Sequence, residues 1–132
     1  GVVLEGMLLK PNMVLSGSSA PVRANPEEVA RRTISCLKRT VPAAVQGIVF
    51  LSGGQDDSEA TVNLDAINRH ANNVTAPWQL SFSSGRGLQA SPLRTWAGKA
   101  ENVSRAQLAY LHRARVTSAA RKGIYEPEME NA

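Results

Sequence analysis

The sequence predicts an α/β fold with a parallel sheet, and three observations support that prediction. Three short β-type runs recur along the 132 residues, at positions 2–9, 47–52 and 78–83. A segment with helical spacing and capping signals follows each run. The first two runs are apolar nearly throughout, as is typical of strands covered on both faces, although periodicity alone does not distinguish them from buried helical segments. The order favours a right-handed β-α-β-α-β arrangement, followed by a short helix and a longer one.

The first run, VVLEGMLL, is followed by Lys10 and Pro11. Proline cannot donate a hydrogen bond to a neighbouring strand, so strand pairing is expected to stop there. An ammonium group is unfavourable inside a strand. Lys10 therefore either reaches the surface with its charged end or is held in a pocket for a chemical purpose.

The next element is a helix that begins in the segment ANPEEV. Asn25 is placed to cap it, and Pro26 suits the first helical position. The two glutamates that follow complement the positive end of the helix. Cys36 is the only cysteine, so it forms no internal disulfide and is expected to be a buried packing residue. One buried stripe is predicted, formed by Val29, Thr33, Cys36, Leu37 and Thr40.

The second helix follows the run GIVFLS, and the last helix follows the third run. Asp56 and Glu59 have the spacing of a capping box, although that motif more often opens with Ser or Thr. The last helix is predicted over 102–122, ended by Gly123 in a left-handed conformation. The polar residues 124–132 are expected to fray. The inner face of the second helix is predicted to contain Ala60, Leu64, Ile67 and Ala71.

The composition is that of an ordinary soluble globular protein. Hydrophobic residues make up 42% and charged residues 20% of the chain. No apolar run approaches the ~18 residues that cross a bilayer, and no secretory signal is recognisable. The net charge of +4 could indicate nucleic acid, but the few aromatic residues argue against base stacking, and a phosphorylated metabolite explains the charge equally well. The histidines are expected at the surface, and neither zinc spacing nor a calcium loop is found, so no metal and no cofactor is predicted.

Small or basic residues follow the second and third runs, at the ends where ligands of parallel α/β folds bind. Glycines between a strand and a helix let backbone N–H groups approach an anion, and the helix dipole favours negative charge. An arginine can grip phosphate oxygens in a fork. Either loop alone could be an ordinary tight turn, but two on adjacent strands favour a phosphate site. The candidate binding residues are Ser52, Gly53 and Gly54 at the end of the second run, and Ser83, Gly85 and Arg86 at the end of the third.

Lys10 ends the first run at the same expected edge, which gives it a chemical interpretation. A lysine amine is a nucleophile only when neutral, and burial or a neighbouring cation lowers the pKa of such an amine from its usual value of about 10.4. The apolar neighbours Leu8, Leu9 and Met13 are expected to supply burial. The alternative is a lysine that reaches solvent or forms a salt bridge.

Five segments together resemble the C-terminal part of class I fructose-1,6-bisphosphate aldolase, in the same order and over nearly the whole chain. They are LLKPNMV, VPAAVQGIVFLSGGQ, TVNLDAIN, PWQLSFSSGRGLQ and RTWAGKAENV. The resemblance implies part of a (β/α)8 TIM barrel, with strands six to eight and the following helices in a single partial domain, 1–132. It also implies a cytoplasmic enzyme of glycolysis and gluconeogenesis that uses no metal and, at full length, forms a homotetramer.

The resemblance also implies roles for the residues at the strand ends. Lys10 matches the lysine that forms a Schiff base with the ketose, in a lyase that cleaves fructose 1,6-bisphosphate to dihydroxyacetone phosphate and glyceraldehyde 3-phosphate. The two glycine loops match the two halves of the phosphate site. The family's acid-base glutamate, a second lysine and an aspartate lie on earlier strands, upstream of this sequence.

Other interpretations remain open. The chain could be a non-catalytic half-barrel that keeps only the phosphate site, or a Schiff-base aldolase for another substrate, which the LLKPNMV and SGGQ pair disfavours. A closed barrel needs ~250 residues, and three strands cannot close one. We therefore expect a fragment that is unstable and inactive when isolated.

Overall fold

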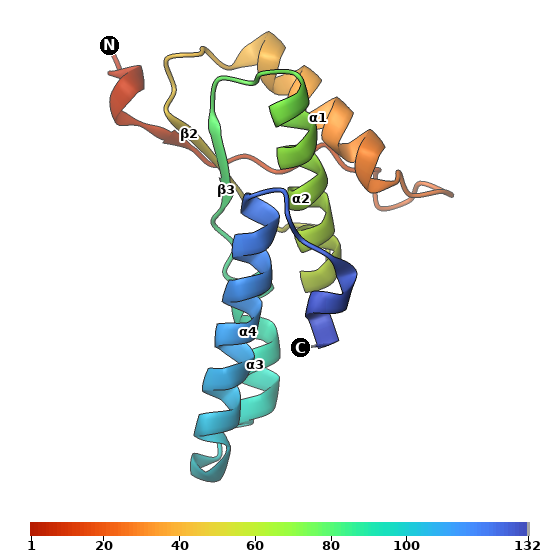
Figure 1. The fold of residues 1–132 in the computed structure, drawn as a ribbon, viewed down its shortest axis with the longest axis vertical. Helices are drawn as coiled ribbons and strands as arrows, with labels where there is room; N and C mark the ends of the chain where they lie inside the picture. The colour runs from red at the N-terminus through yellow and green to blue at the C-terminus, as the bar shows by residue number, and fades with distance from the viewer. Residues whose placement is uncertain (132) are drawn as a thin grey trace.

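A computed structural model describes residues 1–131 of the chain and shows an α/β architecture built on one parallel sheet (Figure 1). The three strands lie in the order β1-β2-β3, and both pairings are parallel. The predicted fold class is therefore confirmed. The strands are β1 (Leu8–Leu9), β2 (Gly47–Phe50) and β3 (Gln79–Phe82), and the main helices are α1 (Pro26–Thr40), α2 (Asp57–Asn73), α3 (Arg86–Trp96) and α4 (Val103–Arg121).

The first strand is much shorter than the run 2–9 predicts. Leu4–Gly6 forms a short 3-10 helix, and Val2 and Val3 are 75% and 70% exposed. Within residues 1–131, β1 is an edge strand with a partner, β2, on one side alone. Apolar residues without a second partner strand gain little from an extended conformation, so pairing begins at Leu8.

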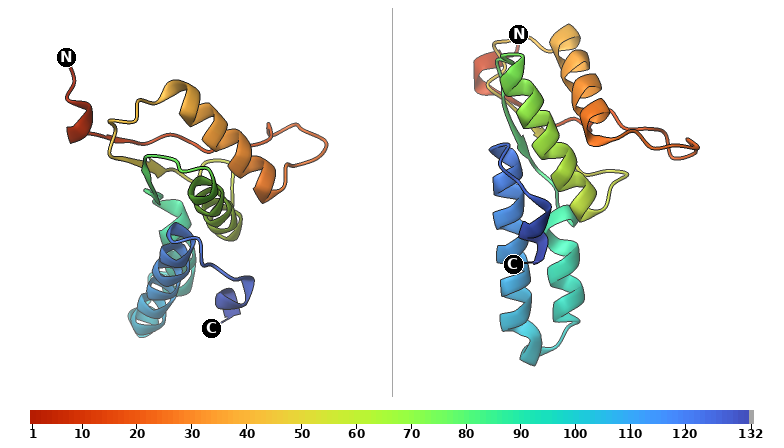
Figure 2. Two further views of the ribbon diagram at one scale, coloured as in Figure 1. Left: turned by 45° about the horizontal axis from the view of Figure 1, so that its top comes forward. Right: turned by 45° about the vertical axis from the view of Figure 1, so that its right-hand side comes forward.

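The helices form two pairs that are visible in both sets of views (Figures 1 and 2). α1 packs against α2, and α3 packs against α4. α4 also contacts α2 and β3, which joins the pairs. Ile48, Phe50 and Leu80 are buried, whereas the alternating positions Val49 and Ser81 are only half-buried. This pattern indicates that the helices cover one face of the sheet.

The start of α1 follows its sequence signals. The Asn25 side chain accepts a hydrogen bond from the backbone N–H of Glu28 at 2.9 Å, and Pro26 occupies the first helical position. The same arrangement opens α2, where Asp56 accepts from the N–H of Glu59 at 2.8 Å. Both caps satisfy amide groups that a helix otherwise leaves without partners.

The buried face of α1 differs from the predicted stripe at two positions. Val29, Thr33 and Leu37 are buried as expected, but Cys36 and Thr40 are exposed. Cys36 lies at the margin of the buried arc, which is completed by Ala30 and Ile34. Thr40 is the last residue of the helix, and its hydroxyl donates to the Cys36 carbonyl at 2.9 Å, so it needs no buried partner.

The C-terminal segment, expected to fray over 124–132, is packed as far as it is described. Gly123 has φ +69° and ends α4, and the chain continues into the 3-10 helix η3 (Pro127–Asn131). Tyr125 is 4% exposed, and its N–H donates to the Asp65 carboxylate at 2.9 Å. The buried aromatic ring, this backbone hydrogen bond and a hydrogen bond from Arg69 to the Tyr125 carbonyl at 2.9 Å hold the segment against α2. Residue 132 lies outside the described residues.

Candidate functional site

Backbone hydrogen bonds bring the ends of the three strands to one edge of the sheet. The N–H of Leu51 donates to the Pro11 carbonyl at 3.1 Å, which continues the β1-β2 pairing past Lys10. The N–H of Ser83 donates to the Phe50 carbonyl at 2.8 Å, which does the same for β2 and β3. The predicted site residues therefore start from neighbouring backbone positions.

The turn after β2 contains two successive glycines, and the backbone requires glycine at the second. Gly54 has φ +79°, a left-handed conformation that other residues adopt at a cost. A Cβ on Gly53 would lie 2.9 Å from Leu51 Cδ1. The N–H of Gln55 donates back to the Ser52 carbonyl at 3.2 Å and closes the turn.

Side chains from two other segments hold the carbonyl groups of this turn. Asn12, two residues after Lys10, donates from Nδ2 to the Gly53 carbonyl at 3.3 Å. Arg23 donates from Nη2 to the Gly54 carbonyl at 3.2 Å and pairs with Glu59 at 2.7 Å. These contacts fix the turn, while within residues 1–131 the two glycine N–H groups donate no protein hydrogen bond.

The loop after β3 leads directly into α3. Gly85 precedes the helix and accepts from the N–H groups of Leu88 and Gln89 at 3.2 and 3.0 Å. Arg86 is exposed at the first helical position. The free N–H groups of this first turn carry the positive end of the helix dipole, so the loop presents positive charge to an anion.

The two glycine loops meet at Gly87. This residue is buried, and a Cβ built on it would lie 3.0 Å from Ser84 Oγ and 3.3 Å from Ser52 Oγ. The hydroxyls of Ser52 and Ser84, which belong to different loops, therefore lie beside one backbone position. The arrangement is that expected of a divided anion site.

Lys10 reaches this edge, but its burial differs from the expectation. Lys10 is exposed, and its neighbour Leu8 is 64% exposed, whereas Met13 is 6% exposed. β1 has no strand on its outer side within residues 1–131, so no side chain covers the lysine from that direction. In this chain Lys10 is a solvent-facing amine at the same sheet edge as the two glycine loops.

The two histidines and the acidic residues were also considered as possible metal ligands. His70 and His112 are both partly exposed. Over positions 1–131, no group of three or more His, Cys, Asp or Glu residues is placed to hold a metal ion. The helices described in the same range lack the combination of length and apolar character that a membrane span requires.

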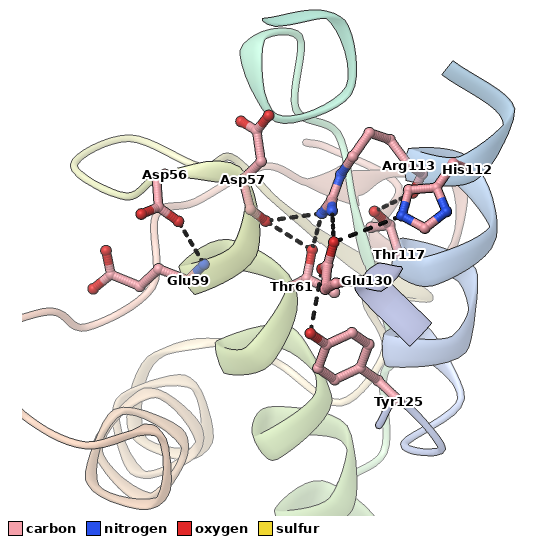
Figure 3. Close-up of polar contacts among 9 residues, drawn as sticks. All are labelled: Asp56, Asp57, Glu59, Thr61, His112, Arg113, Thr117, Tyr125 and Glu130. Carbon is pink, nitrogen blue, oxygen red and sulfur yellow. Dashed lines mark hydrogen bonds and ion pairs between the residues drawn. The ribbon is translucent and has the colours of Figure 1, made fainter. Parts of the chain in front are cut away.

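A buried cluster around Arg113 is the feature that the sequence analysis missed (Figure 3). Arg113 is 5% exposed, and its Nη1 lies 2.5 Å from Glu130 Oε2. Its Nη2 donates to the Asp57 carbonyl at 3.0 Å and to the Thr61 hydroxyl at 2.7 Å. The available signal was helical spacing, because residues 113, 116, 117 and 120 all lie on the buried face of α4.

Tyr125 completes this cluster on the side of the C-terminal segment. Its hydroxyl donates to Glu130 Oε1 at 3.2 Å. Burial raises the pKa of the Tyr125 hydroxyl, and the adjacent Glu130 carboxylate raises it further. The hydroxyl therefore stays protonated and donates its hydrogen bond at neutral pH.

Comparisons with known proteins agree over the whole chain. A family model described as "Fructose-bisphosphate aldolase class-I" matches residues 1–132. Fructose-bisphosphate aldolase 4, cytosolic, of Arabidopsis thaliana is 53% identical over 129 residues, which cover 98% of this chain and 32% of that protein. A cytoplasmic isozyme of fructose-bisphosphate aldolase from Cicer arietinum is 57% identical over 95% of this chain and 34% of that protein.

A solved structure shares the fold. It is the fructose-bisphosphate aldolase of Plasmodium falciparum in complex with TRAP and a small-molecule inhibitor. It superposes with a TM-score of 0.90 at 50% identity, covering 96% of this chain and 35% of that one. The chain thus spans about a third of the length of the proteins it matches.

Proposed function

This chain belongs to the class-I fructose-bisphosphate aldolase family, and from that premise we propose that it is the C-terminal part of a lyase that cleaves fructose 1,6-bisphosphate. The products are dihydroxyacetone phosphate and glyceraldehyde 3-phosphate. One observation supports the proposal above the others. Pairing of Leu51 with Pro11 aligns Lys10 with the turn Ser52–Gly54, so a ketose held by its phosphate would present its carbonyl to the amine.

The proposed chemistry begins at Lys10. Its neutral amine attacks the ketone carbon, and loss of water leaves a protonated imine. When the bond between C3 and C4 breaks, the electron pair moves into the imine and gives an enamine of dihydroxyacetone phosphate. The C4 hydroxyl loses its proton, and the aldehyde fragment leaves as glyceraldehyde 3-phosphate. Protonation of the enamine and hydrolysis of the resulting imine then release dihydroxyacetone phosphate and restore the Lys10 amine. The groups that move protons in these steps are proposed to lie on the strands upstream of this chain.

The phosphate site is proposed to combine both glycine loops. The N–H groups of Gly53 and Gly54, which bond no protein acceptor within residues 1–131, are available to phosphate oxygens. The hydroxyls of Ser52 and Ser83, the backbone at Gly85 and the guanidinium of Arg86 would hold the other side. Such a site would favour phosphorylated substrates, and the family match supports a sugar phosphate among them.

The location and assembly of the full-length enzyme are also proposals. A cytoplasmic location is supported by the names of the relatives from Arabidopsis thaliana and Cicer arietinum, which are described as cytosolic and cytoplasmic. The homotetramer is supported by the family resemblance of the sequence. The charge distribution gives no reason to add a nucleic-acid or membrane partner.

A second candidate function rests on the exposure of Lys10. Both loops of the proposed phosphate site lie within this chain, but the lysine lacks a neighbouring strand on the outer side of β1 in the described range. A chain in this state would bind phosphate without turnover. This alternative is a non-catalytic phosphate-binding half-barrel.

Borohydride reduction separates the two functions. The full-length protein is incubated with dihydroxyacetone phosphate and borohydride, and the modified peptide is mapped by mass spectrometry. We expect an adduct on Lys10 that is lost in Lys10→Met and kept in Lys99→Met, a change at an exposed lysine between α3 and α4. An adduct elsewhere would contradict the catalytic role. Protection from unfolding by phosphate without any adduct would favour the binding module.

A further inference from the structure

The buried guanidinium of Arg113 connects the C-terminal segment to the first turn of α2. On one side it pairs with Glu130 of η3 at 2.5 Å. On the other side it donates to the Asp57 carbonyl and the Thr61 hydroxyl at 3.0 and 2.7 Å. Figure 3 shows these groups converging from α4, α2 and the C-terminal segment.

The pair with Glu130 is what allows a cation to be buried at this position. Within residues 1–131, Glu130 is the carboxylate that forms an ion pair with Arg113. A buried charge whose partner is removed is strongly unfavourable. Tyr125 and Arg113 bond different oxygens of the Glu130 carboxylate, which fixes its orientation.

The groups that Arg113 holds lead directly to the proposed phosphate turn. Asp57 is the first residue of α2 and follows Gln55, whose N–H closes the turn on Ser52. The Gln55 side chain also accepts from Asn63 Nδ2 of α2 at 2.8 Å. The Thr61 hydroxyl donates to the same Asp57 carbonyl at 2.8 Å. A shift of this first turn would therefore carry the phosphate turn with it.

We infer that Arg113 and Glu130 are positioning residues for phosphate binding, and this inference rests on the proposed function of the Ser52–Gly54 turn. Neither residue needs to touch the substrate. The C-terminal segment holds Arg113, Arg113 holds the first turn of α2, and that turn sets the direction of the glycine N–H groups. The segment thereby takes part in substrate affinity while lying outside the strand-end loops.

The test compares two ketones in the full-length enzyme. The concentration that half-saturates borohydride trapping at Lys10 is measured for dihydroxyacetone phosphate and for dihydroxyacetone. Glu130→Gln removes the counter-charge, and Thr61→Val removes the hydroxyl without leaving a charge unpaired. In both variants we expect the half-saturating concentration of dihydroxyacetone phosphate to rise about tenfold, which corresponds to the loss of one hydrogen bond. We expect no change for dihydroxyacetone. Glu128→Gln, on an exposed residue of the same 3-10 helix, should change neither.

Two outcomes would overturn the inference. One is an unchanged value for dihydroxyacetone phosphate in both variants, and the other is an equal loss for both ketones, which would indicate general destabilisation. If Glu130→Gln does not fold, Thr61→Val still decides between these results. Calorimetric binding of inorganic phosphate is measured in parallel and needs no imine. If the unsubstituted enzyme binds phosphate but gives no adduct on Lys10, the proposed lyase function is contradicted. The inference about Arg113 and Glu130 is then decided by whether the two variants bind inorganic phosphate more weakly than the unsubstituted enzyme in the calorimeter.

Discussion

Single residues at the strand ends set the proposed chemistry, and their local surroundings differ greatly. Glycine is favoured at position 54 by the backbone, with φ +79°, and at position 87 by two hydroxyls beside the place that a Cβ would occupy. Lys10 and Arg86 are instead exposed side chains. The glycine turns of the proposed site therefore have a defined backbone conformation in this chain, whereas the side chains of Lys10 and Arg86 are exposed to solvent.

Arg86→Ala tests the side-chain half of the phosphate site. Loss of a charge-assisted, forked contact is expected to lower kcat/KM for fructose 1,6-bisphosphate by about 10- to 100-fold. Trapping of the unphosphorylated ketone dihydroxyacetone should be unchanged, because it has no phosphate to lose. Steady-state kinetics and borohydride trapping measure the two effects.

The matched control for Arg86 is Arg94 in the last turn of the same helix. It is exposed and lies at the opposite end of α3. Arg94→Ala removes the same charge and should leave both substrates unaffected. Equal losses for both substrates in Arg86→Ala would argue against a phosphate contact.

At the scale of elements, α1 and α2 each begin where a polar side chain satisfies one of their first amides. Asn25 caps α1 and Asp56 caps α2 by the same bond to the residue three positions on. For α2 this cap lies directly after the turn proposed to bind phosphate, so the local signal that starts the helix also ends the turn. Local capping therefore contributes to the geometry of the site.

Asn25→Ala tests how much of α1 depends on its cap. Loss of the bond to the Glu28 N–H is expected to cost about 1 kcal/mol locally. Amides in the first turn of α1 should then exchange with solvent about fivefold faster, because 1 kcal/mol corresponds to about that factor. Hydrogen exchange with mass spectrometry measures the change.

Asn25→Asp is the control for this substitution. Aspartate keeps the acceptor oxygen and complements the positive helix end, so protection should be retained or increased. Faster exchange in Asn25→Asp, or unchanged exchange in Asn25→Ala, would show that packing against α2 alone holds the first turn.

For the whole molecule, the open sheet is the dominant feature. β1 is an edge strand with Leu8 64% exposed, and Leu93 of α3 and Leu108 of α4 are 55% and 66% exposed. Edges and apolar patches of this kind favour association with other chains. The fold shows how the C-terminal third of a barrel is organised, and it leaves the closing surfaces uncovered.

We predict that residues 1–132, when isolated, associate and show no cooperative unfolding of a monomer. The exposed strand edge and apolar faces supply the driving force. Sedimentation velocity and a thermal scan measure both properties. Leu8→Lys should reduce the association, since a charge on an edge strand opposes pairing. A well-behaved monomer with one sharp transition would contradict the prediction.

Most of the fold could be predicted because its signals are local. Asn25 and Gly123 mark helix limits through bonds and dihedral angles within a few residues. The run 2–9 was predicted too long, since propensity does not reveal whether a partner strand is present. Cys36 was placed inside, since the exact edge of a buried arc depends on the neighbouring helix. The glycine loops were found from their position after strands, but their mutual contact at Gly87 was not.

The sequence alone determined the family, the parallel α/β order and the residues proposed for the site. Strand runs, caps and motifs each depend on residues that are close together in the sequence. Only the tertiary structure decided that Lys10 is exposed and that Arg113 is buried against Glu130 and α2. Burial and charge pairing depend on residues that meet only after the chain has folded. Arg113 lies 56 positions from Asp57, and no local pattern specifies that contact.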